Sequence, residues 1–137
     1  MINPYYICLS KYLNVMENCI RECADINQLS KCKQDINQAA HSIQKIANIL
    51  NLAGNEVRLK ILYILQKEQK MCPCDLSDVL EMTVPAVSQH LKKLWEGGVL
   101  NKKKQGKTIF YSLNNNEITL ILPMLDQIAI SKITVNQ

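Results

Sequence analysis

The sequence predicts a mainly α-helical fold with one small β-hairpin, which is an α+β chain. Apolar residues recur at helical spacings along most of the 137 residues. One pair of strand-like runs, Val99–Lys104 and Lys107–Leu113, meets across Gln105-Gly106, where glycine permits a tight turn. Because 47% of the residues are hydrophobic and only 20% are charged, the chain has enough apolar material for a core and no disorder signature.

We expect an N-terminal cysteine-bearing segment, residues 1–25, and one domain over residues 26–137. The domain begins with a long helix in which four apolar residues recur every seven positions: Leu29, Ile36, Ile43 and Leu50. Such a stripe is typical of a helix that packs against a partner helix. Gly54 is predicted to adopt a left-handed conformation after this helix, and Asn55 to cap a second helix over Glu56–Lys67.

Two shorter helices and the hairpin follow in the order of a winged helix-turn-helix. We expect a helix over Asp75–Glu81 capped by Asp75, a break, and a helix over Pro85–Glu96 that Gly97-Gly98 ends. A last apolar stripe from Ile118 to Ala129 predicts a C-terminal helix that Pro123 kinks or delays.

The Pro85–Glu96 helix and the hairpin carry the candidate DNA-binding residues. Val87, Leu91 and Leu94 share the inward face of that helix, and six lysines against one acid, Glu96, lie between Lys92 and Lys107. The candidates are Thr83, Pro85, Ala86, Ser88, Gln89, His90, Lys92, Lys93, Lys103, Lys104 and Lys107. Gln89 has the chemistry to pair with an adenine edge. The alternatives are that this run is a solvated helix face and that His90 is a packed residue.

The six cysteines are the second group of candidate functional residues. The N-terminus lacks the pattern of a signal peptide and no apolar run is long enough to span a bilayer, so we expect a cytoplasmic protein without a membrane partner and with reduced cysteines. Cys72 and Cys74 flank Pro73, which favours extended backbone before it and places both sulfurs on one side. Cys19 and Cys23 share one face if Met16–Ala24 is helical, whereas Cys8 and Cys32 have no evident partner.

These motifs resemble the ArsR/SmtB family of metal-sensing repressors. The resemblance rests on Ala53–Leu62, Met71–Leu80, Thr83–Leu94 and Gly106–Leu113, and runs from about Ile43 to Leu125. It implies a homodimer in which the N- and C-terminal helices form the interface and two recognition helices bind an inverted repeat in double-stranded operator DNA. The cysteine arrangement is similar to that of CadC-type sensors, with Cys19, Cys23, Cys72 and Cys74 as the implied metal ligands.

Four thiolates favour a soft metal ion as effector, namely Cd, Pb, Hg, Bi or Zn. Two features depart from related arrangements. Ser77 stands where arsenite-type sensors have a further cysteine. The zinc site that some relatives build from Asp and His on the C-terminal helix is not expected here, because Asn114–Ile133 has no histidine and only Glu117 and Asp126 as acids. The predicted function is a metal-responsive repressor that releases its operator. Alternatives are a redox-sensing repressor in which Cys72 forms a disulfide or polysulfide bridge, a thiol oxidoreductase, and a purely dimerising protein. No nucleophile–base pair or phosphate loop favours another enzyme.

Overall fold

The computed structural model describes residues 6–7 and 24–130, and the chain divides into two compact units, Met1–Ile43 and Gln44–Gln137. In the first unit, strand β1 (Tyr6–Ile7) pairs antiparallel with β2 (Ala24–Asp25). Helix α1 (Ile26–Ala53) starts directly after β2, and the Asp25 carboxylate accepts a hydrogen bond from the Gln28 backbone N–H at 3.1 Å. The boundary between the two units lies within α1.

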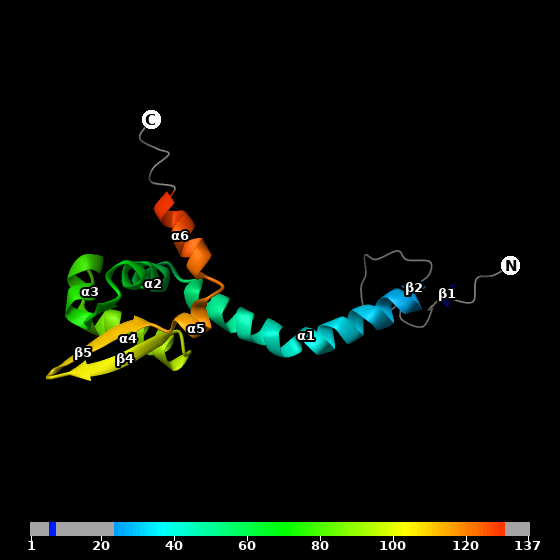
Figure 1. The fold of residues 1–137 in the computed structure, drawn as a ribbon, viewed down its shortest axis with the longest axis horizontal. Helices are drawn as coiled ribbons and strands as arrows, with labels where there is room; N and C mark the ends of the chain where they lie inside the picture. The colour runs from blue at the N-terminus through cyan, green and yellow to red at the C-terminus, as the bar shows by residue number, and fades with distance from the viewer. Residues whose placement is uncertain (1–5, 8–23, 131–137) are drawn as a thin grey trace, which may run out of the picture. The chain divides into compact units, whose positions relative to one another are not determined.

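The second unit contains five further helices and a three-stranded antiparallel sheet of order β3-β5-β4 (Figure 1). The helices are α2 (Glu56–Glu68), α3 (Pro73–Leu80), α4 (Val84–Glu96), α5 (Asn115–Ile118) and α6 (Leu122–Ile130). The strands are β3 (Lys70–Met71), β4 (Leu100–Gln105) and β5 (Thr108–Leu113). The predicted mainly α-helical fold with a small hairpin is confirmed. Strand β3 adds an element that the sequence analysis did not predict, because two residues are too few to show an alternating pattern.

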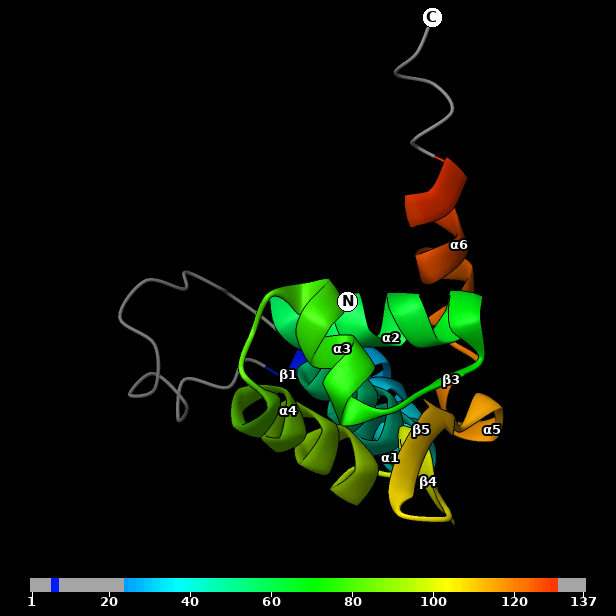
Figure 2. The same cartoon turned by 90° about the vertical axis from the view of Figure 1, so that its left-hand side faces the viewer.

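The core of the second unit lies between the helices and the base of the hairpin. Its fully buried side chains come from α2 (Ile61, Leu62, Leu65), α3 (Leu76), α4 (Val87, Leu91, Leu94), the start of β4 and the last two helices (Ile118, Leu125). Helix α4 packs against both α3 and β4, and Figure 2 shows α3 beside α4. The position of α4 is therefore fixed by the two elements that precede and follow it in the chain.

Two predicted helix ends are wrong in detail, and a third prediction is confirmed in one of its two forms. Helix α3 begins at Pro73, and the residue that caps it is Cys72, whose sulfur accepts a hydrogen bond from the Asp75 backbone N–H at 3.4 Å. Asp75 therefore lies inside the first turn and is not the cap. Gly54 does not have a positive φ, whereas Gly98 does, at 76°. Of the two predicted effects of Pro123 the structure shows the delay and not the kink, because α6 begins only at Leu122 and its first turn tolerates a missing N–H.

Gly98 ends α4 in a Schellman motif that leads directly into the hairpin. Its backbone N–H donates to the Trp95 carbonyl at 2.9 Å, and the Val99 N–H donates to the Leu94 carbonyl at 3.0 Å. Among the helices that the structure describes, none is long and apolar enough to cross a membrane.

Candidate nucleic-acid interface and thiol pair

Helix α4 presents its predicted polar face to solvent. Val87, Leu91 and Leu94 are fully buried, whereas Gln89, Lys92 and Lys93 are exposed and Ala86 and Ser88 are half-buried. The helix starts at a capped end, since the Thr83 hydroxyl accepts a hydrogen bond from the Ala86 N–H at 3.4 Å. Pro85 lies in the first turn. The N-terminal half of α4 therefore offers side chains of the size and polarity that major-groove binding uses.

The turn between α3 and α4 is held by a buried hydroxyl. Ser77 is 8% exposed and its Oγ donates to the Met82 carbonyl at 2.5 Å. Glu81 takes a left-handed conformation with φ of 53°, which ends α3 and directs the chain towards α4. Ser77 therefore fastens the helix-turn-helix at the position where an arsenite-type sensor has a thiol.

His90 is half-buried on α4 and faces positive charge. Burial lowers its pKa below the usual value, and Arg58 and then Lys93 lower the pKa further. Its Nδ1 is buried without a hydrogen-bond partner. The Arg58 guanidinium donates from Nε to the Leu52 carbonyl and from a terminal nitrogen to the Asn51 carbonyl at 3.1 Å, so it fastens the end of α1 to α2. The position of His90 agrees better with the packed alternative than with a side chain directed at DNA.

The wing lysines lie on both faces of the hairpin. Lys103 pairs with Phe110 and Lys104 with Ile109 across β4 and β5, so successive lysines point to opposite sides. Gly106, with φ of 62°, holds the first of two loop positions, and Lys107 holds the second. A positive φ at the first loop position matches a type II′ turn. All three lysines are exposed, which gives the hairpin a basic surface on each side of its tip.

Cys72 and Cys74 lie at the N-terminus of α3, but in different surroundings. Cys72 is 8% exposed and caps the helix, while Cys74 is exposed in its first turn. Cys72 has the extended backbone that Pro73 predicts, but Cys74 lies within the helix, so the predicted strand-like placement of the two sulfurs is wrong. Cys32, on α1, is exposed. Cys19 and Cys23 lie outside the described residues, as does Cys8.

The described residues do not complete a metal site by themselves. Within residues 6–7 and 24–130 no three or more histidine, cysteine or acidic side chains gather at one point. Glu117 pairs with Lys45 at 3.0 Å, and Asp126 accepts a hydrogen bond from Gln66 at 2.7 Å. Both acids of the last two helices are thus engaged in contacts that hold α5 to α1 and α6 to α2.

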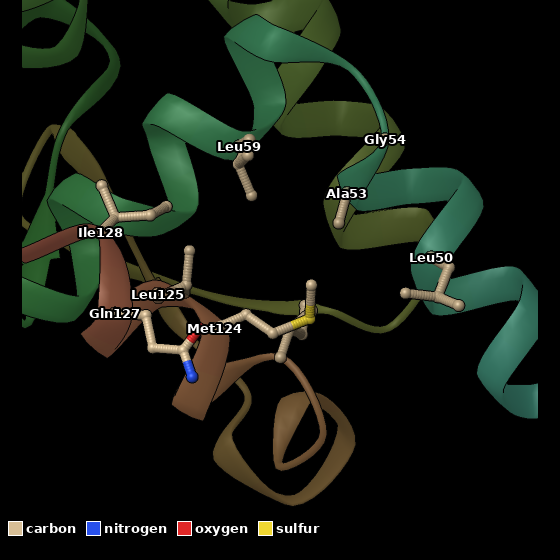
Figure 3. Close-up of a pocket in the computed structure, with 9 residues that line it drawn as sticks. Leu50, Ala53, Gly54, Leu59, Met124, Leu125, Gln127 and Ile128 are labelled. Carbon is tan, nitrogen blue, oxygen red and sulfur yellow. The ribbon is translucent and has the colours of Figure 1, made fainter. Parts of the chain in front are cut away.

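An apolar hollow of about 460 Å³ opens beside the C-terminal helix (Figure 3). Side chains from the end of α1, from α2 and from α6 line it: Leu50, Ala53, Leu59, Ile121, Met124, Leu125, Gln127 and Ile128, with Gly54 at its edge. Leu50 and Met124 are about half exposed, at 49% and 56%. The hollow thus lies between the predicted N- and C-terminal dimerisation helices.

The fold and the α4 surface together define a winged helix-turn-helix DNA-binding protein. Residues 55–102 match the model of the family described as bacterial regulatory protein, arsR family. The arsenical resistance operon repressor of Bacillus subtilis (strain 168) is 31% identical over 58% of this chain and 76% of its own length. The chain belongs to the arsR family. It is a DNA-binding transcriptional regulator and not an enzyme.

Two further relatives support this assignment. A cadmium resistance transcriptional regulatory protein CadC homolog of Staphylococcus aureus is 27% identical over 67% of this chain and 74% of its own. The structure of reduced HlyU from Vibrio cholerae N16961 superimposes with a TM-score of 0.61 at 31% identity, covering 66% of this chain and 95% of that one. The resemblance that the sequence motifs indicated is therefore confirmed at the level of family and fold.

Proposed function

We propose that the protein is a repressor that releases its operator when a soft metal ion, of the Cd, Pb, Hg, Bi or Zn class, binds its cysteine thiolates. One observation carries the proposal. Cys72 caps α3 and Cys74 lies in its first turn, and α3 packs directly on the recognition helix α4. A ligand held by these sulfurs acts on the element that positions the DNA-binding surface. The names of two relatives, for cadmium and arsenical resistance, agree with a metal as effector.

The DNA-binding half of the proposal assigns roles by position. Gln89 and Ser88 contact base edges, and Lys92, Lys93, Lys103, Lys104 and Lys107 contact phosphates. The first turn of α4 lies against the DNA backbone through Thr83, Pro85 and Ala86. His90 is half-buried and stabilises the position of α4. Two copies of the chain then bind the two halves of an inverted repeat.

The metal-binding half needs thiolates from two parts of the chain. Cys72 and Cys74 supply two sulfurs, and Cys19 and Cys23 are the proposed second pair. Soft ions prefer thiolate ligands, and two pairs provide up to four sulfurs, the number that a tetrahedral site such as that of zinc requires. Binding of both pairs ties the N-terminal segment to α3, and reciprocal linkage then requires metal and operator DNA to weaken each other's binding.

The test is the fluorescence anisotropy of labelled operator as Cd(II) or Pb(II) is added to the reduced dimer. We expect the wild-type protein to release DNA and Cys72→Ser to retain it. Cys72→Ser is a clean variant because serine is itself a preferred N-cap residue, so the hydroxyl takes over the hydrogen bond from Asp75 N–H. Metal-free operator affinity should therefore match the wild type.

Two controls sharpen this experiment. Cys32→Ser removes an exposed thiol from α1 that has no role in the proposal, and it should release DNA as the wild type does. Full metal-driven release by Cys72→Ser would contradict the thiolate mechanism. Release by an oxidant and not by metal would instead establish the redox alternative, with Cys72 bridged to another thiol.

A further inference from the structure

Trp95, the only tryptophan of the chain, lies near the end of α4 and is 38% exposed. The Lys102 ammonium, on strand β4, lies over its ring with Nζ 3.2 Å from the ring centroid. Tryptophan is the strongest aromatic partner for a cation, since its ring face carries negative electrostatic potential. The contact joins the recognition helix to the wing.

The local fold explains why these two side chains meet. Leu100 is buried at the start of β4 and faces the core, so Lys102, two residues later, lies on the same side of the hairpin. The Schellman turn at Gly97–Val99 connects the end of α4 to β4 within three residues. The Schellman turn keeps the end of α4 close to the start of β4. The contact between Lys102 and Trp95 joins the same helix and strand a second time, two residues after Leu100.

The lysines of this region are not equivalent. Lys102 is engaged by Trp95, and Lys92 lies 3.8 Å from the Glu96 carboxylate. Lys103 lies on the opposite face of β4, with its cross-strand partner Phe110. Both side chains of the Lys92–Glu96 pair are exposed, so Lys92 remains accessible to a phosphate. Within the described part of the chain, Lys93, Lys103, Lys104 and Lys107 make no ion pair or ring contact, so their charges are available to phosphates as well.

We propose that Lys102 is a positioning residue for DNA binding and not a phosphate ligand. By lying over Trp95 it holds the wing at a set angle to α4, so that the helix in the major groove and the lysines of the wing engage one DNA duplex together. A wing that moves independently of α4 still carries its positive charge. DNA binding then has to restrict its motion, and this cost in conformational entropy lowers the affinity. This role rests on the proposed contact of α4 and the wing with DNA.

The contact itself is tested first in the free protein by NMR. Protons above an aromatic ring are shielded, so the Lys102 Hε resonance should lie upfield of those of Lys103 and Lys104, and should return to their range in Trp95→Leu. An unshifted Lys102 Hε resonance in the wild type would overturn the proposal. This result needs no DNA and is independent of the proposed function.

The role is tested by the salt dependence of operator affinity. Lys102→Gln should weaken binding roughly two- to fivefold, as loss of an exposed cation–π contact does, without changing the slope of log affinity against log salt. Lys103→Gln, the matched control on the opposite face, should lower the magnitude of that slope by about 0.9, since a lost phosphate contact releases one fewer counterion. Lys102→Arg should restore affinity, because arginine also stacks on tryptophan.

A double-mutant cycle completes the test. Trp95→Leu should weaken binding in the wild-type background and have no further effect in Lys102→Gln, because either change breaks the same contact. A reduced salt slope in Lys102→Gln, or fully additive effects of the two changes, would overturn the positioning role. If the wild-type protein did not bind duplex DNA at all, the proposed function would be wrong, and with it the positioning role of Lys102. The NMR experiment would still show whether Lys102 lies over Trp95.

Discussion

At the scale of single residues, the structure separates side chains that hold the fold from side chains that face solvent. Ser77 and His90 both belong to the helix-turn-helix. Ser77 is buried and its hydroxyl donates to a backbone carbonyl, while His90 is half-buried with its Nδ1 buried. Gln89, which directly precedes His90 in α4, is exposed. We therefore propose Gln89, and not His90, as the residue that contacts base edges.

Gln89→Ala should reduce the discrimination between operator and random DNA by about 1–3 kcal/mol, the value of one bidentate base contact. Folding should be unaffected, because the side chain is exposed. Competition binding with operator and random duplexes at one salt concentration measures the ratio. The contrasting variant is Lys103→Ala, which should weaken both duplexes equally. An unchanged ratio in Gln89→Ala would remove this residue from the recognition surface.

At the scale of elements, apolar periodicity predicted each long helix, and local backbone geometry decided the ends. The apolar residues of α4 and the glycine of the hairpin predicted the ends of both elements to within one or two residues of those in the structure. The start of α3 was not predictable from residue preferences, because cysteine is an uncommon cap and Asp75 is a strong one. The Trp95–Lys102 contact depends on the angle between α4 and β4, which no spacing in the sequence states.

The junction of α4 and β4 gives a stability prediction. Gly98→Ala should lower the free energy of unfolding by about 1–2 kcal/mol, since a side chain at φ of 76° is strained even though an added Cβ would meet no atom within 4 Å. Urea denaturation measures this difference. Gly97→Ala is the matched control, where backbone φ is ordinary but the Cβ would collide with the Leu52 side chain.

The two glycine variants should respond differently to a second change. Leu52→Ala removes the methyl groups that an added Cβ at Gly97 would meet, so it should relieve the effect of Gly97→Ala. It should not relieve the effect of Gly98→Ala, whose origin is the backbone. Equal relief of both would mean that Gly98 also depends on side-chain contacts and would contradict the strain argument.

At the scale of the whole molecule, an apolar surface remains beside α6 after the second unit has formed its core. Leu50 and Met124 line the hollow of about 460 Å³ and stay about half exposed. Exposed apolar patches of this kind mark association sites in many proteins. Leu50 is also the last of the apolar residues that recur every seven positions in the sequence, a pattern typical of a helix that packs against a partner, and we take a second copy of the chain as the occupant of this surface.

Leu50→Glu or Met124→Glu should therefore convert the dimer to monomer without unfolding it. Each side chain is exposed in the protomer, so the charge is solvated there, whereas a dimer would bury it without a partner. An unpaired buried charge costs about 3–5 kcal/mol, which raises the dimer dissociation constant by at least about 100-fold. Sedimentation equilibrium measures the change, and circular dichroism checks that the helices persist.

The matched control is Val79→Glu, which places the same charge on an apolar residue of α3 that is 57% exposed and lies outside the hollow. It should leave the dimer intact. Operator binding should follow the state of assembly: the monomeric variants should bind a single half-site as the wild-type protomer does, and should lose the additional affinity of an inverted repeat, because two linked half-sites bind with an effective concentration that separate monomers lack. A Leu50→Glu protein that remains dimeric would show that the copies meet on another face.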